Sequence, residues 1–174
     1  FTASQPWMVG LVCAFEIPFL AAMVLQYILI HKYWQVVQDG FARTSPGKAV
    51  GFLFIPVFQY YWLYVAYYGL AIDMNGYIDR HFQANLGGNV RKTHPVLSLI
   101  YIIMTWVYLL ITISLGIVLL IQGFSTFDSP AELSRLMQPY MIAIYIYAFV
   151  QMGLMIAVFF DFHRTARGIL EKEA

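Results

Sequence analysis

Four long apolar stretches, residues 7–33, 49–72, 95–122 and 139–162, alternate with short polar connections along this chain. Each reaches the ~20 residues that an α-helix needs to cross the hydrocarbon core of a bilayer. Apart from Lys32 at the end of the first stretch, only Glu16 and Asp161 carry a formal charge within them. The pattern predicts an all-α fold, a polytopic integral membrane bundle of four hydrophobic helices in one domain, with residues 163–174 as a short helical tail.

Composition agrees with this class of protein. The chain is 61% hydrophobic and 11% charged, whereas a soluble domain is about 25% charged. The net charge of +1 gives no basic tract that would bind nucleic acid. The single cysteine, Cys13, cannot form an internal disulfide. We expect the lipid bilayer and other membrane protein subunits as partners, and no nucleic acid.

Two topologies fit the four stretches. If all four span the membrane, the lysines and arginines divide six to four between its sides. If the second stretch is re-entrant or lies in the interface, three helices span and nine basic residues share one side. These nine are Lys32, Arg43, Lys48, Arg80, Arg91, Lys92, Arg164, Arg167 and Lys172, and only Arg135 lies opposite. The positive-inside rule favours the second topology.

The second stretch has a composition that permits either path. Pro56 interrupts it after seven apolar residues. At about 100° per residue, the five tyrosines that follow fall within about 120° of arc. They are Tyr60, Tyr61, Tyr64, Tyr67 and Tyr68. Such a face suits a helix in the membrane interface, or a spanning helix whose tyrosines hydrogen-bond to neighbouring helices. We take Tyr60, Tyr64, Tyr67 and Tyr68 as candidates to face a partner.

Polar residues also recur at helical spacing in the third and fourth stretches. Ser98, Tyr101, Thr105 and Tyr108 share one face of the third helix, and Gln151 lies within the fourth. Faces of this kind pack against other helices, where each hydrogen bond contributes ~0.6–2 kcal/mol. We expect this row and Gln151 to contact helices of this chain or of a partner subunit.

Glu16 is the most unusual residue of the first stretch. It lies about ten residues into the predicted helix, with Pro18 two positions later. A charged carboxylate near mid-bilayer costs ~3 kcal/mol even on the lenient insertion scale. Glu16 is therefore either a proton-relay or ion-coordinating group, or a neutral packing group that hydrogen-bonds to a carbonyl freed by Pro18 or to a Tyr or Gln of another helix.

Three histidines, His31, His94 and His163, lie at the ends of apolar stretches. Under the three-span topology they share one side, where they offer ligands for a metal, a haem or a pigment. No pair has the i, i+4 spacing of a metal site. The sequence therefore predicts no cofactor.

A family resemblance is carried by residues 38–75. Residues 46–56 read PGKAVGFLFIP, and Tyr61-Trp62 and Asp73-x-Asn75 follow. This part of the chain resembles a group of uncharacterised bacterial inner-membrane proteins with a PGKAVGFLFIPFFN-x-YW core and a later D-x-N. Val57-Phe58-Gln59 stands where that pattern has F-F-N. The resemblance implies a bacterial cytoplasmic membrane location and brings no activity. Lys48 is followed by Ala49, so the segment is not a phosphate-binding loop.

The sequence contains no paired acid and base, nucleophile motif or phosphate motif. We therefore expect a non-enzymatic protein, an accessory or scaffolding subunit of a larger bacterial membrane complex. Two alternatives stay open. One is a small transporter or proton-conducting protein that uses Glu16, and the other is a haem- or pigment-holding subunit of an electron-transfer or photosynthetic complex.

Overall fold

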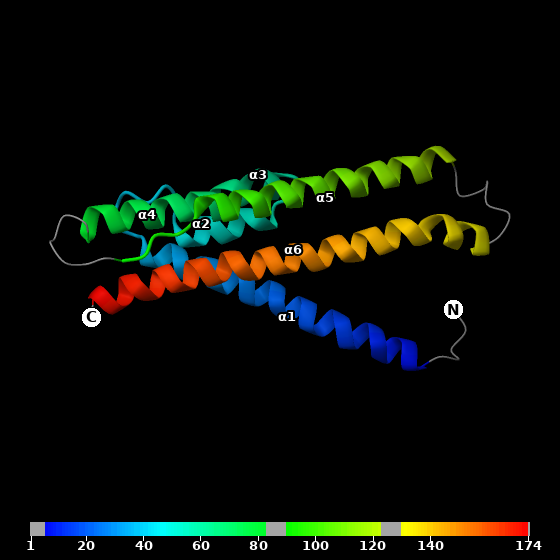
Figure 1. The fold of residues 1–174 in the computed structure, drawn as a ribbon, viewed down its shortest axis with the longest axis horizontal. Helices are drawn as coiled ribbons and strands as arrows, with labels where there is room; N and C mark the ends of the chain where they lie inside the picture. The colour runs from blue at the N-terminus through cyan, green and yellow to red at the C-terminus, as the bar shows by residue number, and fades with distance from the viewer. Residues whose placement is uncertain (1–5, 83–89, 123–129, 174) are drawn as a thin grey trace.

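A computed structural model describes residues 6–82, 90–122 and 130–173, and this part of the chain is helical without strands. Three long helices, α1 (Pro6–Val36), α5 (Pro95–Gln122) and α6 (Pro130–Glu173), form the frame. In Figure 1, α1 begins at one end of the bundle and α6 finishes at the other. The side chain of Glu16 lies outside the described residues, so its predicted role stays a prediction.

Two of the described helices are long and apolar enough to cross a membrane. The segments are Pro95–Val118 of α5, with 24 residues, and Ile142–Glu173 of α6, with 32. At 1.5 Å per residue, the 28 residues of α5 extend about 42 Å. The predicted fourth helix over 139–162 is part of a longer one, because α6 runs unbroken from Pro130 to Glu173.

The second apolar stretch folds as a hairpin. One arm consists of α2 (Pro46–Gly51) and the 3₁₀ turn η1 (Phe52–Phe54). The other consists of α3 (Phe58–Leu63), the π-helical segment η2 (Tyr64–Gly69) and α4 (Leu70–His81). Both arms lie in the same half of the bundle in Figure 1. A single helix over 49–72 is therefore wrong, and the chain reversal is the geometry that the re-entrant alternative requires.

Pro56 explains where the hairpin reverses. A residue before proline is driven out of the helical region, and Ile55 has φ −85° and ψ 113°. Val57 then adopts φ 66° and ψ −52°, and the Phe58 N–H donates to the Pro56 carbonyl at 2.7 Å. This is a γ-turn of the rare, strained kind. The returning arm packs on the first, where Trp62 Nε1 donates to the Ala49 carbonyl at 3.0 Å.

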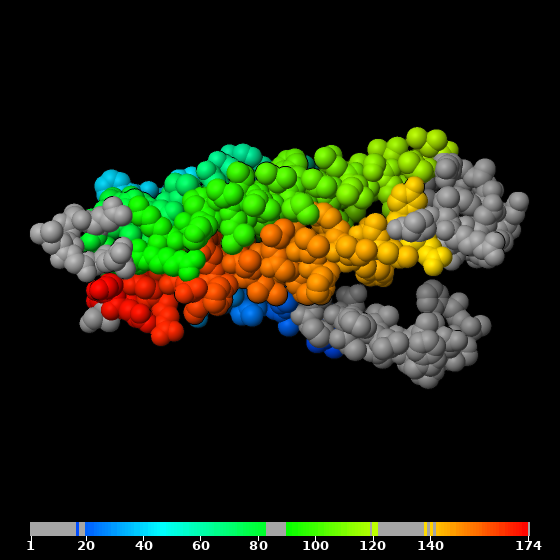
Figure 2. All heavy atoms as spheres, viewed as in Figure 1, coloured from blue at the N-terminus to red at the C-terminus, as the bar shows by residue number. Residues whose placement is uncertain are grey.

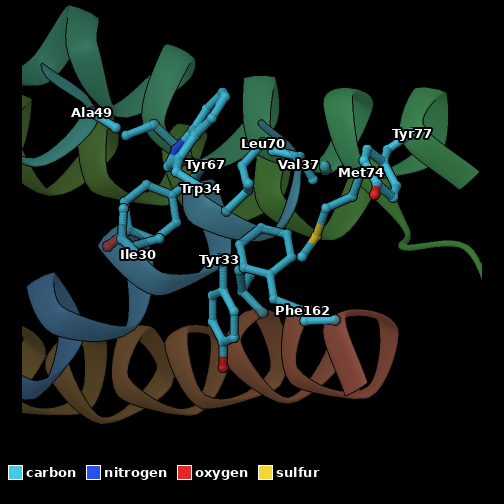
Figure 3. Close-up of a cluster of buried hydrophobic side chains, with 14 of the residues drawn as sticks. Ile30, Tyr33, Trp34, Val37, Ala49, Tyr67, Leu70, Met74, Tyr77 and Phe162 are labelled. Atoms are coloured by element: carbon cyan, nitrogen blue, oxygen red, sulfur yellow. The ribbon is translucent and has the colours of Figure 1, made fainter. Parts of the chain in front are cut away.

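The core of the described fold is where the hairpin meets α1 and α6. Figure 3 shows Trp34 and Tyr33 of α1 between hairpin residues and Phe162 of α6. Trp34 is fully buried, and its Nε1 donates to the Ala66 carbonyl at 3.2 Å. That carbonyl lies in η2, so the indole satisfies a polar group within an apolar core.

The three long helices are not equally close along their length. Space-filling spheres in Figure 2 show α5 and α6 packed side by side. α1 contacts α6 through Tyr33, whose ring lies 6.2 Å from that of Phe159 and 6.0 Å from that of Phe162. Toward its N-terminus α1 diverges from α6 (Figure 1). The hairpin therefore fills only the half of the bundle in which α1 and α6 touch.

Candidate functional site

The end of the bundle that holds the hairpin base carries a network of ion pairs, which we call the polar end. The C-terminal ends of α1, α4 and α6 and the N-terminal ends of α2 and α5 meet there (Figure 1). The nine basic residues of the three-span topology lie on these ends or on the adjoining connections. The fold therefore gathers them at one end, whatever surrounds the protein.

Two ion pairs close the base of the hairpin. Arg43 donates from its backbone N–H and its Nε to the two carboxylate oxygens of Asp73, at 2.9 and 2.8 Å. Arg80 donates from Nε and Nη2 to Asp39 Oδ2, at 2.8 and 2.6 Å. Both carboxylates are mostly buried. Each pair joins the connection after α1 to α4, so together they hold the two arms of the hairpin at the same end.

The ionised form of Asp39 is stabilised by its hydrogen-bond donors. Burial of this carboxyl favours its neutral form, but hydrogen bonds from Arg80 and from the Phe41 backbone N–H outweigh that effect. Together they hold the pKa of Asp39 below its ordinary value. The polar end therefore depends on an ionised Asp39.

Asn75 and Thr93 fasten the hairpin to the start of α5. The Thr93 N–H donates to Asn75 Oδ1 at 2.8 Å, and Asn75 Nδ2 donates to the Thr93 carbonyl at 3.1 Å. Thr93 Oγ1 also donates to the Ala71 carbonyl at 3.0 Å. The pair Asn75-Gly76 resembles a turn signal, yet it lies inside α4 because these tertiary bonds outweigh local preference.

Asp161 joins α6 to the beginning of α5. Its buried carboxylate accepts the His94 backbone N–H at 2.7 Å, and the His94 ring nitrogen Nδ1 lies 3.2 Å from it. Arg91 Nη2 approaches at 3.4 Å. Because His94 immediately precedes α5, Asp161 caps that helix from another part of the chain.

A second polar group of contacts lies in the middle of the bundle. Gln26 Nε2 of α1 donates to the hydroxyl of the fully buried Tyr67. The ring of Tyr101 lies 5.2 Å from that of Tyr67. Gln151 Nε2 donates to Thr105 Oγ1 at 2.6 Å and to the Tyr101 carbonyl at 3.3 Å. These contacts join α1, the hairpin, α5 and α6 at one level.

The candidate partner-facing residues are divided between interior and surface. Tyr67, Tyr101 and Ser98 are buried within this chain. Thr105 is half-buried against Gln151, and Tyr60 and Tyr68 are half-buried. Tyr60 packs on Trp106, and Tyr68 stacks on Tyr64. Tyr64 and Tyr108 remain exposed, although Tyr108 also stacks on Tyr147 of α6.

The three histidines do not converge on a common ligand position. His94 faces Asp161, His163 is exposed on α6, and His31 is half-buried on α1. Among the described residues, no group of three His, Cys, Asp or Glu side chains is placed to hold a metal ion. These contacts hold the helices in position. The acidic side chains in them are already paired with basic side chains of the same chain.

Several residues of these networks were not singled out as site candidates from the sequence. Asp39, Arg43, Arg80, Gln26 and Thr93 belong to contacts between segments far apart in the chain. Asp73 and Asn75 had one available signal, the Asp-x-Asn that follows the aromatic segment.

No family model, curated protein or solved structure matches this chain.

Proposed function

We propose that this chain is a multi-pass protein of the bacterial cytoplasmic membrane and a non-catalytic accessory subunit of a larger membrane complex. In this proposal α1, α5 and α6 span the bilayer, and the hairpin enters from the polar end and returns to it. The polar end is cytoplasmic, because nine of the ten lysines and arginines lie there. The partial resemblance to bacterial inner-membrane proteins supports the same location.

The proposal depends most on Tyr145, whose surface is 67% exposed on α6. Tyr147, two residues away, stacks on Tyr108, which lies 13 positions after the start of α5. At 1.5 Å per residue this level is about 20 Å from the polar end, close to the middle of a ~30 Å hydrocarbon core. A phenol at that depth has no hydrogen-bonding partner in lipid.

The surroundings of Tyr145 form a surface that fits another transmembrane helix. Ile142, Ile146, Phe149 and Met152 are exposed on the same helix at spacings of three and four residues. We call this strip, with Tyr145, the α6 strip. Helix association in lipid depends on packing and on interhelical hydrogen bonds. Gln151 Nε2 and the Tyr67 hydroxyl have hydrogen-bond partners inside the chain, whereas Tyr145 is exposed, so the α6 strip is the surface proposed for a partner subunit.

Co-purification in a mild detergent tests the accessory role. The tagged chain is compared with Tyr145→Phe, which removes only the hydroxyl, and with Ile121→Ala, an exposed control near the far end of α5. We expect one or a few membrane proteins to be recovered with the parent and the control, and to be reduced severalfold with Tyr145→Phe. The accessory role would be contradicted if the tagged chain were recovered alone, with no other protein bound to it.

Topology is tested separately by labelling single cysteines in a Cys13→Ala background. Phe41 and Lys92 are exposed on the connections that flank the hairpin. Phe41→Cys and Lys92→Cys should both react only with reagent on the cytoplasmic side. Labelling of these two positions from opposite sides would contradict three spans with a re-entrant hairpin.

A further inference from the structure

The hairpin carries exposed apolar and aromatic side chains that the described part of the chain leaves uncovered. They are Phe54, Ile55, Val57, Phe58, Tyr61 and Tyr64, and we call the surface that they form the hairpin face. Val57 at the tip is 81% exposed and Tyr61 is 58% exposed. Both arms of the hairpin contribute to this surface, together with the turn that joins them.

The tip of the hairpin reaches deep into the bundle. Tyr60, close to the tip, packs on Trp106 of α5, with ring centroids 6.3 Å apart. Trp106 follows the start of α5 by 11 residues, which is about 16 Å along the helix. On the proposed topology the tip therefore lies near the middle of the bilayer, where no water satisfies backbone groups.

The backbone at this tip is irregular and partly unsatisfied. The residues at the reversal leave the helical ladder, and within the described part of the chain nothing accepts the N–H of Val57. Irregular backbone at membrane depth is tolerated only where protein covers it or where it lines a water-filled cavity. Val57 also holds φ 66°, a conformation that a β-branched residue adopts at a cost. Protein contact at the tip would satisfy the exposed backbone.

The hairpin face itself carries a side chain, Tyr61, whose hydroxyl is a hydrogen-bond acceptor of the kind that the Val57 N–H lacks. Tyr61 follows Val57 by four residues, so the two lie one turn apart on the returning arm. Side chains of a helix lean toward its N-terminus, and the N-terminus of α3 is at the tip. The Tyr61 side chain therefore leans toward the level of Val57. Its hydroxyl can accept a hydrogen bond, and a twofold axis along the membrane normal brings equal depths of two copies together.

We propose that the hairpin faces of two copies of this chain pack against each other about such an axis. The Tyr61 hydroxyl of each copy lies beside the exposed Val57 backbone of the other, and Phe54 and Phe58 provide the apolar surround. The depth assigned to the tip rests on the membrane topology proposed above, whereas the self-contact is a separate surface from the α6 strip. A homodimer of this kind is an assembly that the accessory role does not require.

Single-cysteine cross-linking in native membranes tests this contact. In a Cys13→Ala background, Val57→Cys and Tyr61→Cys are compared with Leu110→Cys, which is similarly exposed on α5. We expect oxidation or a short bis-maleimide to give a covalent dimer at positions 57 and 61 and little at 110. Equal cross-linking at all three positions would indicate random collision and overturn the proposal, as would a cross-link to a different protein or no cross-link at 57 and 61.

A second measurement isolates the hydroxyl of Tyr61. Dimerisation of the purified chain in detergent is followed by energy transfer between labelled copies, with Tyr61→Phe as the variant and Tyr145→Phe as the matched control. Each copy contributes one interhelical hydrogen bond, so Tyr61→Phe removes two from the dimer and should raise the dissociation constant about tenfold to a hundredfold. Tyr145→Phe should leave self-association unchanged while it weakens recovery of other subunits. A reversed pattern would overturn the self-contact, and failure of the accessory role alone would leave the Tyr61 effect in place.

Discussion

Asp161 offers a direct way to measure what holds α5 to α6 at the polar end. Three donors approach its carboxylate: the His94 backbone N–H at 2.7 Å, the His94 ring at 3.2 Å and Arg91 at 3.4 Å. A hydrogen bond to a charged group contributes about 1.5–3 kcal/mol. The ring of His94 and the guanidinium of Arg91 are both well exposed, so each adds only about 0–1 kcal/mol.

These values predict a graded series of losses in the free energy of unfolding. Asp161→Ala should cost about 2–4 kcal/mol, mostly through the His94 N–H that then lacks its acceptor. Asp161→Asn should cost about 1–2 kcal/mol, because a neutral carbonyl still accepts that bond more weakly. Arg91→Ala should cost less than about 1 kcal/mol. This order follows if the hydrogen bond from the His94 N–H contributes more to the free energy of unfolding than the ion pair with Arg91 does.

Unfolding in mixed micelles with increasing sodium dodecyl sulfate provides the assay. Circular dichroism follows the loss of helix. Tryptophan fluorescence follows the loss of tertiary packing, because Trp34 is fully buried in the folded chain. A double variant, Asp161→Ala with Arg91→Ala, should cost little more than Asp161→Ala alone. If Arg91→Ala costs as much as Asp161→Ala, the assignment of the main contribution to the His94 N–H is refuted.

Three further predictions concern Asp39, Val57 and Glu16. Because its folded pKa is lowered, Asp39 contributes stability that is complete above its ordinary pKa of about 4 and is lost as pH falls through the lowered value; the unfolding midpoint should decline in acid more steeply for the parent than for Asp39→Asn. Val57→Gly should relieve about 1–2 kcal/mol of strain at its positive φ, and the added entropy of the unfolded chain offsets about 0.5–1 kcal/mol of this, so the net gain is about 0–1.5 kcal/mol; Val57→Ala, which keeps its Cβ, should not stabilise. Glu16→Gln should preserve expression and assembly, whereas Glu16→Leu should cost ~1–2 kcal/mol through a lost hydrogen bond; ion flux that disappears in the Gln variant while assembly stays normal would instead indicate proton chemistry.

Tyr77 and Glu173 illustrate a contact that no local pattern indicates. The Tyr77 hydroxyl of α4 donates to the carboxylate of Glu173 at the end of α6. Burial, followed by this hydrogen bond, raises the pKa of Tyr77 to about 12. The two residues are almost a hundred positions apart, and only the meeting of α4 and α6 at the polar end brings them together.

Local patterns in the sequence were sufficient to predict the all-helical class, the helical third and fourth apolar stretches and the interruption at Pro56. Each of these follows from local physics, since long apolar runs favour helices that satisfy their own backbone and proline lacks an N–H. The distribution of lysine and arginine along the chain also favours the three-span topology through the positive-inside rule. The spacing of Ser98, Tyr101 and Thr105 likewise predicted a face that contacts other helices, because a period of three or four residues places side chains on one face.

The path of the chain after Pro56 and the pairing of distant polar groups depend on how the helices pack in three dimensions. Periodicity gives the same arc to Tyr61, Tyr64 and Tyr67, but only the return path past α1 and α5 buries Tyr67 and leaves Tyr61 exposed. The partners of Asp39, Asp73 and Asp161 likewise depend on chain reversal and helix docking. A carboxylate in a sequence carries no information about its partner, because the attraction between charges depends on distance in space and on burial rather than on distance along the chain.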